Sequence, residues 1–326
     1  MGSLREIRRR IGSVQKTQKI TQAMQKVASA KLHKAQTLLG YVLPYEVRLR
    51  NILLTFVHEG CISCKDGSLF LRNEMLQTAV TDARAVNKVS LVFVASDTGL
   101  CGAYNSNMER KLFEVVEEYA GLPADHVTLY PIGQKMLETA KKTEHPINDT
   151  FVDLMTHLSF SSVELFANTL IEEYKNGLSD KTEFVFYHFR SMASQVIRRD
   201  VLLPFQAIPE GVEVRMPDTE PKGKHGVFIP QEHQTRVLGP DDVEGYLTEP
   251  NGEELLEALL LRVIQYNFYK SVLDANASEH AARTIAMKAA SENAEDLIKD
   301  LKLQYNKSRQ QAITAEILDI VSGSVR

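Results

Sequence analysis

The sequence predicts an α/β protein in which a long antiparallel coiled coil, made of the N- and C-terminal helices, carries an inserted Rossmann-like βα domain. Two observations lead to this prediction. Both ends of the chain show helical periodicity over unusually long stretches, and the segment between them alternates short apolar runs with helical ones. The expected units are a discontinuous coil over residues 1–58 and 251–326, a βα domain over 80–206, and an irregular segment over 207–250 that is rich in Pro, Gly and charge.

The N-terminal segment carries a heptad pattern across residues 4–56. Two series of positions, each with a seven-residue spacing, interleave as in a coiled-coil seam. They are Leu4, Ile11, Gln18, Gln25, Leu32, Leu39, Glu46 and Leu53, and Ile7, Val14, Thr21, Ala28, Ala35, Val42, Leu49 and Phe56. A helix of this length would be roughly 80 Å long and needs a partner of similar length.

The middle of this seam is polar, because the first series reads Gln18 and Gln25 there. If the local period relaxes toward 3.6, the apolar side should shift to Ile20, Met24 and Val27. The seam is therefore expected to be weak at this point. Further along, Pro44 removes one backbone donor and should kink the helix.

The C-terminal segment contains neither proline nor glycine from Glu253 to Ser322. An unbroken helix of that length would be roughly 100 Å long, so it is the expected partner of the N-terminal helix. Small side chains on its stripe would let that partner approach closely. The expected stripe is Ile264, Phe268, Val272, Ala275, Ala282, Ile285 and Ala289.

The central segment alternates strand and helix patterns, which indicates a βα domain with a mostly parallel sheet. The expected strands are residues 88–96, 126–132, 150–154, 183–189 and 195–205, and the expected helices are 105–119, 134–142 and 161–176. After the first strand, Gly99 and Gly102 match neither dinucleotide nor P-loop spacing. We interpret these glycines as a tight strand-to-helix turn.

The chain shows no catalytic constellation, and we expect neither a cofactor nor a metal. Its histidines are scattered, and Cys101 has no obvious base nearby. Three cysteines cannot make a disulfide framework, which favours a reducing compartment, and Cys61 and Cys64 are interpreted as two thiols in a turn. No apolar run is long enough to span a membrane.

Charge is unevenly distributed along the chain, whose net charge is −4. Residues 1–34 contain nine lysines and arginines but only one acid, Glu6. A basic helix of this kind could bind nucleic acid, an anionic membrane surface or acidic protein partners, or it could simply be a solvated face. Nucleic acid is the least favoured of these, because no aromatic residue for base stacking precedes Tyr41.

Three stretches together closely resemble the gamma subunits of F-type ATP synthases. Residues 4–32 read LREIRRRIGSVQKTQKITQAMQKVASAKL, residues 96–107 read SDTGLCGAYNSN, and residues 277–323 run from ASEHAARTIAMKAASENA to YNKSRQQAITAEILDIVSG. The chain departs from the family at Thr98, where arginine is common, and at Ala103, where a second glycine is common. The segment over residues 211–238 also looks longer than the common bacterial linker.

The resemblance implies a central rotor shaft that couples ion-driven rotation of a membrane c-ring to ATP synthesis or hydrolysis on the beta subunits. The implied partners are the alpha and beta subunits of the catalytic hexamer, the epsilon subunit and the c-ring, with no nucleic acid and no small-molecule substrate. The chain itself would not be catalytic. It would lie peripherally on the cytoplasmic face of the bacterial inner membrane.

The resemblance also assigns site residues. Coupling contacts with the beta subunit would come from Met24, Arg283, Arg309, Gln310, Thr314 and Glu316. The foot of the shaft, which meets epsilon or the c-ring, would include Tyr246 and Glu249.

Two alternatives from other classes remain at this stage. The first is a free-standing coiled-coil arm with a hinge-like domain that binds DNA through its basic helix. The second is a redox or dehydrogenase enzyme built on the central domain.

Overall fold

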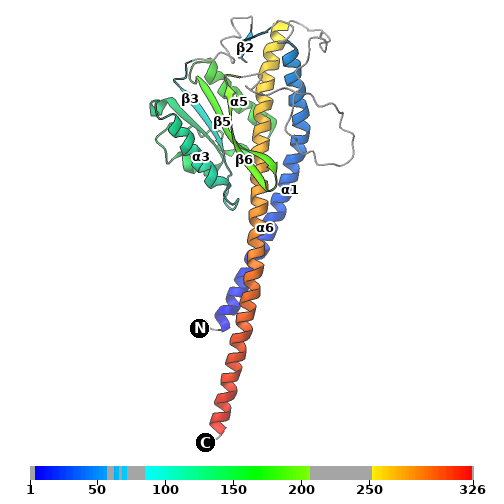
Figure 1. The fold of residues 1–326 in the computed structure, drawn as a ribbon, viewed down its shortest axis with the longest axis vertical. Helices are drawn as coiled ribbons and strands as arrows, with labels where there is room; N and C mark the ends of the chain where they lie inside the picture. Colours follow the sequence, from blue (N-terminus) through cyan, green and yellow to red (C-terminus); the bar gives the residue numbers. More distant parts are fainter. Residues whose placement is uncertain (1–3, 57–61, 66–67, 72–84, 206–251, 325–326) are drawn as a thin grey trace.

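The computed structural model describes residues 4–56, 62–65, 68–71, 85–205 and 252–324. Helix α1 (Leu4–Phe56) and helix α6 (Gly252–Ser324) run antiparallel, side by side, and the βα domain lies beside the half of the coil that is farther from the termini (Figure 1). Helix α6 extends past the N-terminal end of α1 (Figure 1). The predicted fold class is confirmed.

The heptad seam of α1 is confirmed over its described side chains. Every member of both series up to Leu53 is buried or half-buried. The expected shift of the apolar side is wrong, however, because Ile20 and Val27 are 59% and 57% exposed. The seam keeps its heptad register through Thr21 and Ala28, whose small side chains let the helices stay close. Helix α1 continues through Pro44.

The stripe expected on α6 is confirmed as far as Ala282, which is half-buried against an apolar core of the domain, and is wrong at its last two positions. From Ile264 to Ala275 the expected positions are buried, whereas Ile285 and Ala289 are exposed. Here α6 has left the sheet, and its buried side follows a heptad seam toward α1, so a different set of residues is buried. That set is Thr284, Met287, Ser291, Ala294, Ile298 and Leu301.

The domain contains a four-stranded sheet with the order β4-β3-β5-β6. Strands β3 (Val89–Val94), β4 (Val127–Ile132) and β5 (Lys181–Ser191) are parallel, and β6 (Ser194–Leu203) is antiparallel to β5. Two short strands, β1 (Ile62–Lys65) and β2 (Ser68–Leu71), form a separate antiparallel pair.

The strand expected over residues 150–154 is wrong. This segment forms a 3₁₀ turn, η4 (Val152–Met155), after a similar turn, η3 (Ala124–His126), earlier in the chain. Leu154 and Met155 bury their side chains in the apolar core, and the Gly133 N–H donates to the Val152 carbonyl at 2.8 Å. A short apolar run cannot be assigned to strand or turn from periodicity alone.

Helices cover both faces of the sheet. Helices α3 (Tyr104–Glu118) and α4 (Gln134–Ala140) pack on one face, against Leu91 and Phe93. Helices α5 (Phe160–Lys175) and α6 pack on the other, against Val92 and Val94. Alternate residues of β3 thus point to opposite cores, as the pleat requires. Helix α6 is therefore at once a covering layer of the sheet and one half of the coil.

The polar break in the seam at Glu46 is an ion-paired site. Its carboxylate, which is almost fully buried, lies 2.6 Å from Arg50 Nη2 and 3.6 Å from Lys270 Nζ on α6. Burial alone would raise the pKa of Glu46, but the charges of Lys270 and Arg50 outweigh that effect and lower the pKa. The carboxylate thus stays ionised and joins the two helices beside the domain.

We expect Glu46→Gln to destabilise the chain by about 1 to 3 kcal/mol at pH 7, because it leaves Lys270 and Arg50 without their anion. Since the folded pKa of Glu46 lies below its unfolded value, the carboxylate stabilises the fold above the ordinary glutamate pKa. That contribution is lost as the pH falls toward the folded pKa. Urea unfolding followed by far-UV circular dichroism at pH 7 and pH 4 measures both effects.

The matched control is Glu292→Gln, because Glu292 lies 3.9 Å from Lys288 in an exposed pair on the same coil. Such a pair should contribute less than about 1 kcal/mol. An equal loss of stability in the two variants would contradict the assignment of Glu46 as an ionised carboxylate that joins the helices. So would a loss of stability in Glu46→Gln that is as large at pH 4 as at pH 7.

Candidate functional site

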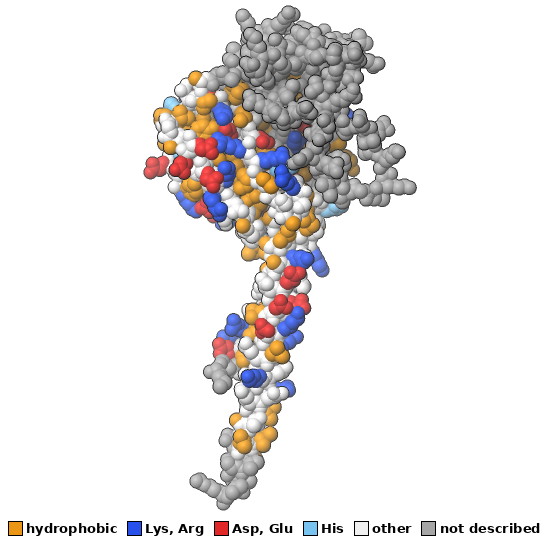
Figure 2. All heavy atoms as spheres, viewed as in Figure 1, with side chains coloured by type: hydrophobic (Ala, Val, Ile, Leu, Met, Phe, Trp, Pro, Cys, Tyr) orange, Lys and Arg blue, Asp and Glu red, His pale blue; other side chains and the backbone are white. Residues whose placement is uncertain are grey.

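The last turns of α6 form a surface that this chain leaves uncovered. We call residues 302–324 the free end, because among the described side chains none after Leu301 is buried. Figure 2 shows hydrophobic side chains gathered near this end of the coil. They belong to a set with exposed fractions of 46–71%, namely Ile313, Ile317, Leu318 and Ile320. An exposed apolar helix end of this kind is typical of a protein interface.

Four of the predicted site residues lie on the free end and are exposed: Arg309, Gln310, Thr314 and Glu316. The Thr314 hydroxyl donates to the Gln310 carbonyl one turn earlier, at 2.9 Å. The structure therefore groups these four on one stretch of helix, with polar and apolar side chains interspersed.

Met24 lies at the edge of the coil seam and is half-buried. Its neighbours one turn away, Ile20 and Val27, are exposed, as are Lys19 and Lys26. Met24 thus borders an apolar strip within a basic helix. The structure does not group it with Arg283, which is buried beneath the domain.

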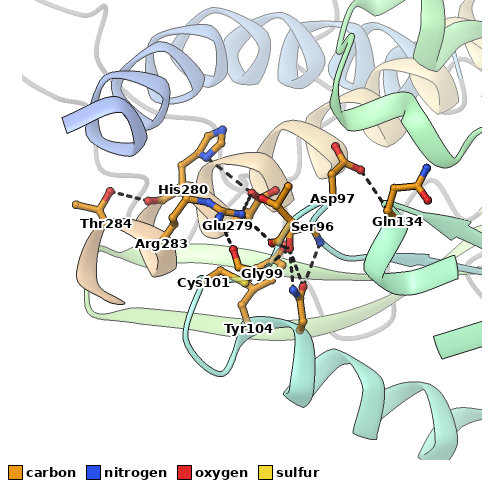
Figure 3. A network of polar contacts seen from close by, with 12 residues as sticks. Ser96, Asp97, Gly99, Cys101, Tyr104, Gln134, Glu279, His280, Arg283 and Thr284 are labelled. Atoms are coloured by element: carbon orange, nitrogen blue, oxygen red, sulfur yellow. Dashed lines mark hydrogen bonds and ion pairs between the residues drawn. The ribbon is translucent and has the colours of Figure 1, made fainter. Parts of the chain in front are cut away.

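Arg283 belongs to a second site, which we call the joint. The joint consists of the loop over residues 96–102 and the α6 residues 279–283 (Figure 3). Arg283 Nη1 donates to the Gly99 carbonyl at 2.5 Å, and Nη2 donates to the Thr98 carbonyl at 3.1 Å and to Glu279 Oε1 at 2.7 Å. The side chain of Arg283 thereby links the domain to the coil.

The loop is also held by its own domain. Ser96 Oγ donates to the Thr98 carbonyl at 2.7 Å, so that carbonyl accepts two bonds. Asp97 accepts from the Gln134 N–H at 3.2 Å (Figure 3). It also accepts from the Thr156 hydroxyl at 2.8 Å. The tight turn predicted between strand and helix is confirmed, since the loop connects β3 to α3 with positive φ at Leu100 and Gly102.

Two other titratable groups of the joint are strongly influenced by burial. Burial raises the pKa of Glu279, although Arg283 opposes the shift. Burial, followed by the charges of Lys31 on α1 and of Arg283, lowers the pKa of His280 to about 4, and its Nδ1 has no hydrogen-bond partner among the described residues. His280 is therefore neutral at pH 7, and the ion pair of the joint is the one between Arg283 and Glu279.

Sequence reasoning missed the joint as a site. Glu279, His280 and Thr284 were not singled out, and Arg283 was assigned only by resemblance. The sequence does contain a signal for buried charges. The run E-H-A-A-R places Glu279 and Arg283 among alanines on a helix that carries an apolar stripe. Buried charges of this kind need partners.

Several predictions from the sequence concern residues outside those described. Tyr246 and Glu249 fall there, as do Cys61 and the whole of the 207–250 segment, and no side chain is described for Cys64 in β1. Cys101 is buried, with its Sγ 3.6 Å from Ser96 Oγ.

The described residues contain neither a metal-binding cluster nor a membrane-spanning helix. No group of three or more histidine, cysteine, aspartate or glutamate side chains in this part of the chain is arranged to hold a metal ion. Nor does any described helix combine the length and the apolar character needed to cross a membrane.

Comparison with known proteins covers nearly the whole chain. A family model described as ATP synthase matches residues 3–325. The chain is 38% identical to the ATP synthase gamma chain of Bacteroides thetaiotaomicron, with 100% of both chains covered. It is 34% identical to the ATP synthase gamma chain of Flavobacterium johnsoniae, with 99% of this chain and 98% of that one covered.

Solved structures support the fold. A chain of the Euglena gracilis mitochondrial ATP synthase, in an assembly of OSCP, F1 and the c-ring, has a TM-score of 0.56 at 20% identity and covers 99% of this chain and 93% of its own. A rotor chain of the same enzyme in another rotational state has a TM-score of 0.52 at 19% identity, with 95% and 98% covered. The family match over residues 3–325 and the full-length relatives together show that this chain belongs to the ATP synthase gamma chain family.

Proposed function

We propose that the chain is the central rotor shaft of an F-type ATP synthase. It couples rotation of an ion-driven c-ring to ATP synthesis or hydrolysis, while the chemistry takes place on the beta subunits. The observation that carries this proposal is the double role of α6, which packs within the βα domain near its start and ends in an exposed helical stretch. Rotation imposed on the domain is thereby passed to the free end through one continuous helix.

The proposed partners follow from the two ends of this shaft. The coil and its free end sit inside the hexamer of alpha and beta subunits, where Met24, Arg309, Gln310, Thr314 and Glu316 meet the beta subunits. The domain and the 207–250 segment stand on the c-ring and bind the epsilon subunit, with Tyr246 and Glu249 at that contact. The complex lies on the cytoplasmic face of a bacterial inner membrane.

The mechanism requires the shaft to be asymmetric about its axis. A beta subunit changes its nucleotide affinity only if the shaft binds its conformations unequally, so successive beta subunits must meet different faces. The described coil supports this requirement. Helix α1 offers basic residues and the exposed Ile20 and Val27, whereas the exposed face of α6 mixes acids with bases. Family membership leaves the alternative of a DNA-binding arm without support.

Co-purification tests the assignment directly. We expect a tagged copy of the chain, isolated with mild detergent from the cell that makes it, to bring down three alpha and three beta subunits per gamma chain, together with epsilon and the c-ring. The exposed apolar free end needs such partners. Recovery of the chain alone, or bound to DNA, would contradict the rotor assignment.

The double variant Arg309→Ala/Gln310→Ala tests the coupling contacts. Because alanine is an excellent helix former, α6 should keep its local stability and the complex its stoichiometry. If these side chains form charge-assisted hydrogen bonds at some shaft angles and not at others, their loss removes about 1.5 to 3 kcal/mol at a rotary step. We therefore expect ATP turnover to fall by roughly one to two orders of magnitude.

The readout is steady-state ATPase activity of the purified complex, normalised to gamma content. Lys299→Ala is the control, because Lys299 makes only exposed intrahelical pairs with Glu295 and Asp296 among the described contacts. Wild-type turnover in the double variant would remove Arg309 and Gln310 from the coupling site.

A further inference from the structure

Arg283 differs from the other candidate coupling residues in being turned inward. It is 8% exposed, whereas Arg309 and Gln310 on the same helix are exposed. The contacts described for its guanidinium go to the Thr98 and Gly99 carbonyls and to Glu279 of its own chain. Arg283 is thus engaged by its own chain, and little of its side chain is left for a partner protein to contact.

The loop that Arg283 holds has an unusual backbone. Leu100 has a φ of 66°, a left-handed conformation that is uncommon for a residue other than glycine. Its side chain is 63% exposed, so packing of that side chain does not explain the conformation. Strained residues persist only where the surrounding structure fixes them. Here the two carbonyls that immediately precede Leu100 are the ones that Arg283 binds (Figure 3).

The joint lies where the coil leaves the domain. Closer to the start of α6, residues from Leu260 to Ala275 belong to the apolar core that they share with the sheet. Ala282 packs against the core on the α3 side, and a Cβ atom placed on Gly102 would lie 3.7 Å from Ala286 Cβ. Beyond this level α1 and α6 continue without the domain (Figure 1). Among the described contacts between domain and coil, the joint is thus the polar attachment nearest to the exposed coil.

We propose that Arg283 is a positioning residue that fixes the 96–102 loop, and through it β3 and α3, to α6, so that domain and coil turn as one body. The inference rests on the proposed rotor function. Arginine suits this role because its planar guanidinium presents several donors in fixed directions, so it can bind two carbonyls and a carboxylate together. Glu279 balances its charge in the buried site.

The variant that isolates this role is Arg283→Met/Glu279→Gln. Arg283→Met alone would leave Glu279 as a buried, unpaired acid, so the second change removes that complication while the two loop bonds stay absent. In the intact complex, we expect amide hydrogen exchange in the loop to become roughly ten- to a hundredfold faster, as the loss of the charge-assisted bonds to the Thr98 and Gly99 carbonyls implies. The angular spread of a probe on the domain, measured in complexes stalled without ATP, should also broaden.

The matched control is Arg262→Met. Arg262 also connects α6 to the domain, since its Nη1 lies 2.8 Å from Glu164 Oε1 on α5, but the pair is much more exposed. We expect this variant to keep wild-type exchange in the loop and a wild-type angular spread. A purely stabilising role for Arg283 would lower the unfolding temperature without broadening the angular spread.

Wild-type exchange and angular spread in Arg283→Met/Glu279→Gln would overturn the proposal. If that variant does not assemble, Arg283→Lys takes its place, because it keeps the charge beside Glu279 but not the planar donor set. We expect it to show faster loop exchange and a broader angular spread, both to a smaller degree. Wild-type behaviour of the lysine variant would equally overturn it. A probe on the wild-type domain that does not turn when ATP is supplied would contradict the rotor function itself. Hydrogen exchange in the loop would still test whether Arg283 fixes the loop to α6.

Discussion

The packing of α6 against two different partners is the constraint on which the rest of the structure depends. On one side Phe268 meets Phe184 and Phe166 in edge-to-face contacts, with ring centroids 4.7 and 5.3 Å apart, which fixes the helix to the sheet. On the other side Ala277 and Ala281 pack against Leu32 and Ala35 of α1. A single helix satisfies both partners because it changes from large aromatic to small side chains along its length.

Polar pairs fix the rotation of α6 within this packing. Glu46 binds Lys270, Asp274 binds His188 and also accepts from the Phe189 N–H at 2.9 Å, and Arg283 binds the loop. Buried ion pairs contribute little net stability compared with apolar packing, but a misaligned pair leaves an uncompensated charge. An apolar interface alone would allow α6 to slide against its neighbours. These polar pairs make such sliding unfavourable. A shaft that transmits torque needs that resistance more than it needs additional stability.

The sequence predicted the parts of the structure that depend on local pattern. The heptads of α1, the breaker-free α6 and the alternation of strands and helices all follow from periodicity. The errors lie where tertiary contacts decide, as at Ile285, where α6 leaves the sheet, and in the η4 turn, which the core holds. The partner of Arg283 was equally unpredictable, because Gly99 is 184 residues away in the chain. The exposed Arg309 and Gln310 still rest on resemblance as coupling residues.

The central claim is that the βα domain and the coil turn together, as one body, relative to a fixed hexamer that surrounds the coil. Its most direct test is a single-molecule rotation assay of the purified complex, with the hexamer attached to a surface and a probe on Leu165→Cys, an exposed site on α5. Cys61 and Cys64 are replaced by serine to direct the label. The account predicts full revolutions of the probe in one direction, in discrete steps, when ATP is supplied. ATP hydrolysis at a normal rate with a stationary probe would contradict it.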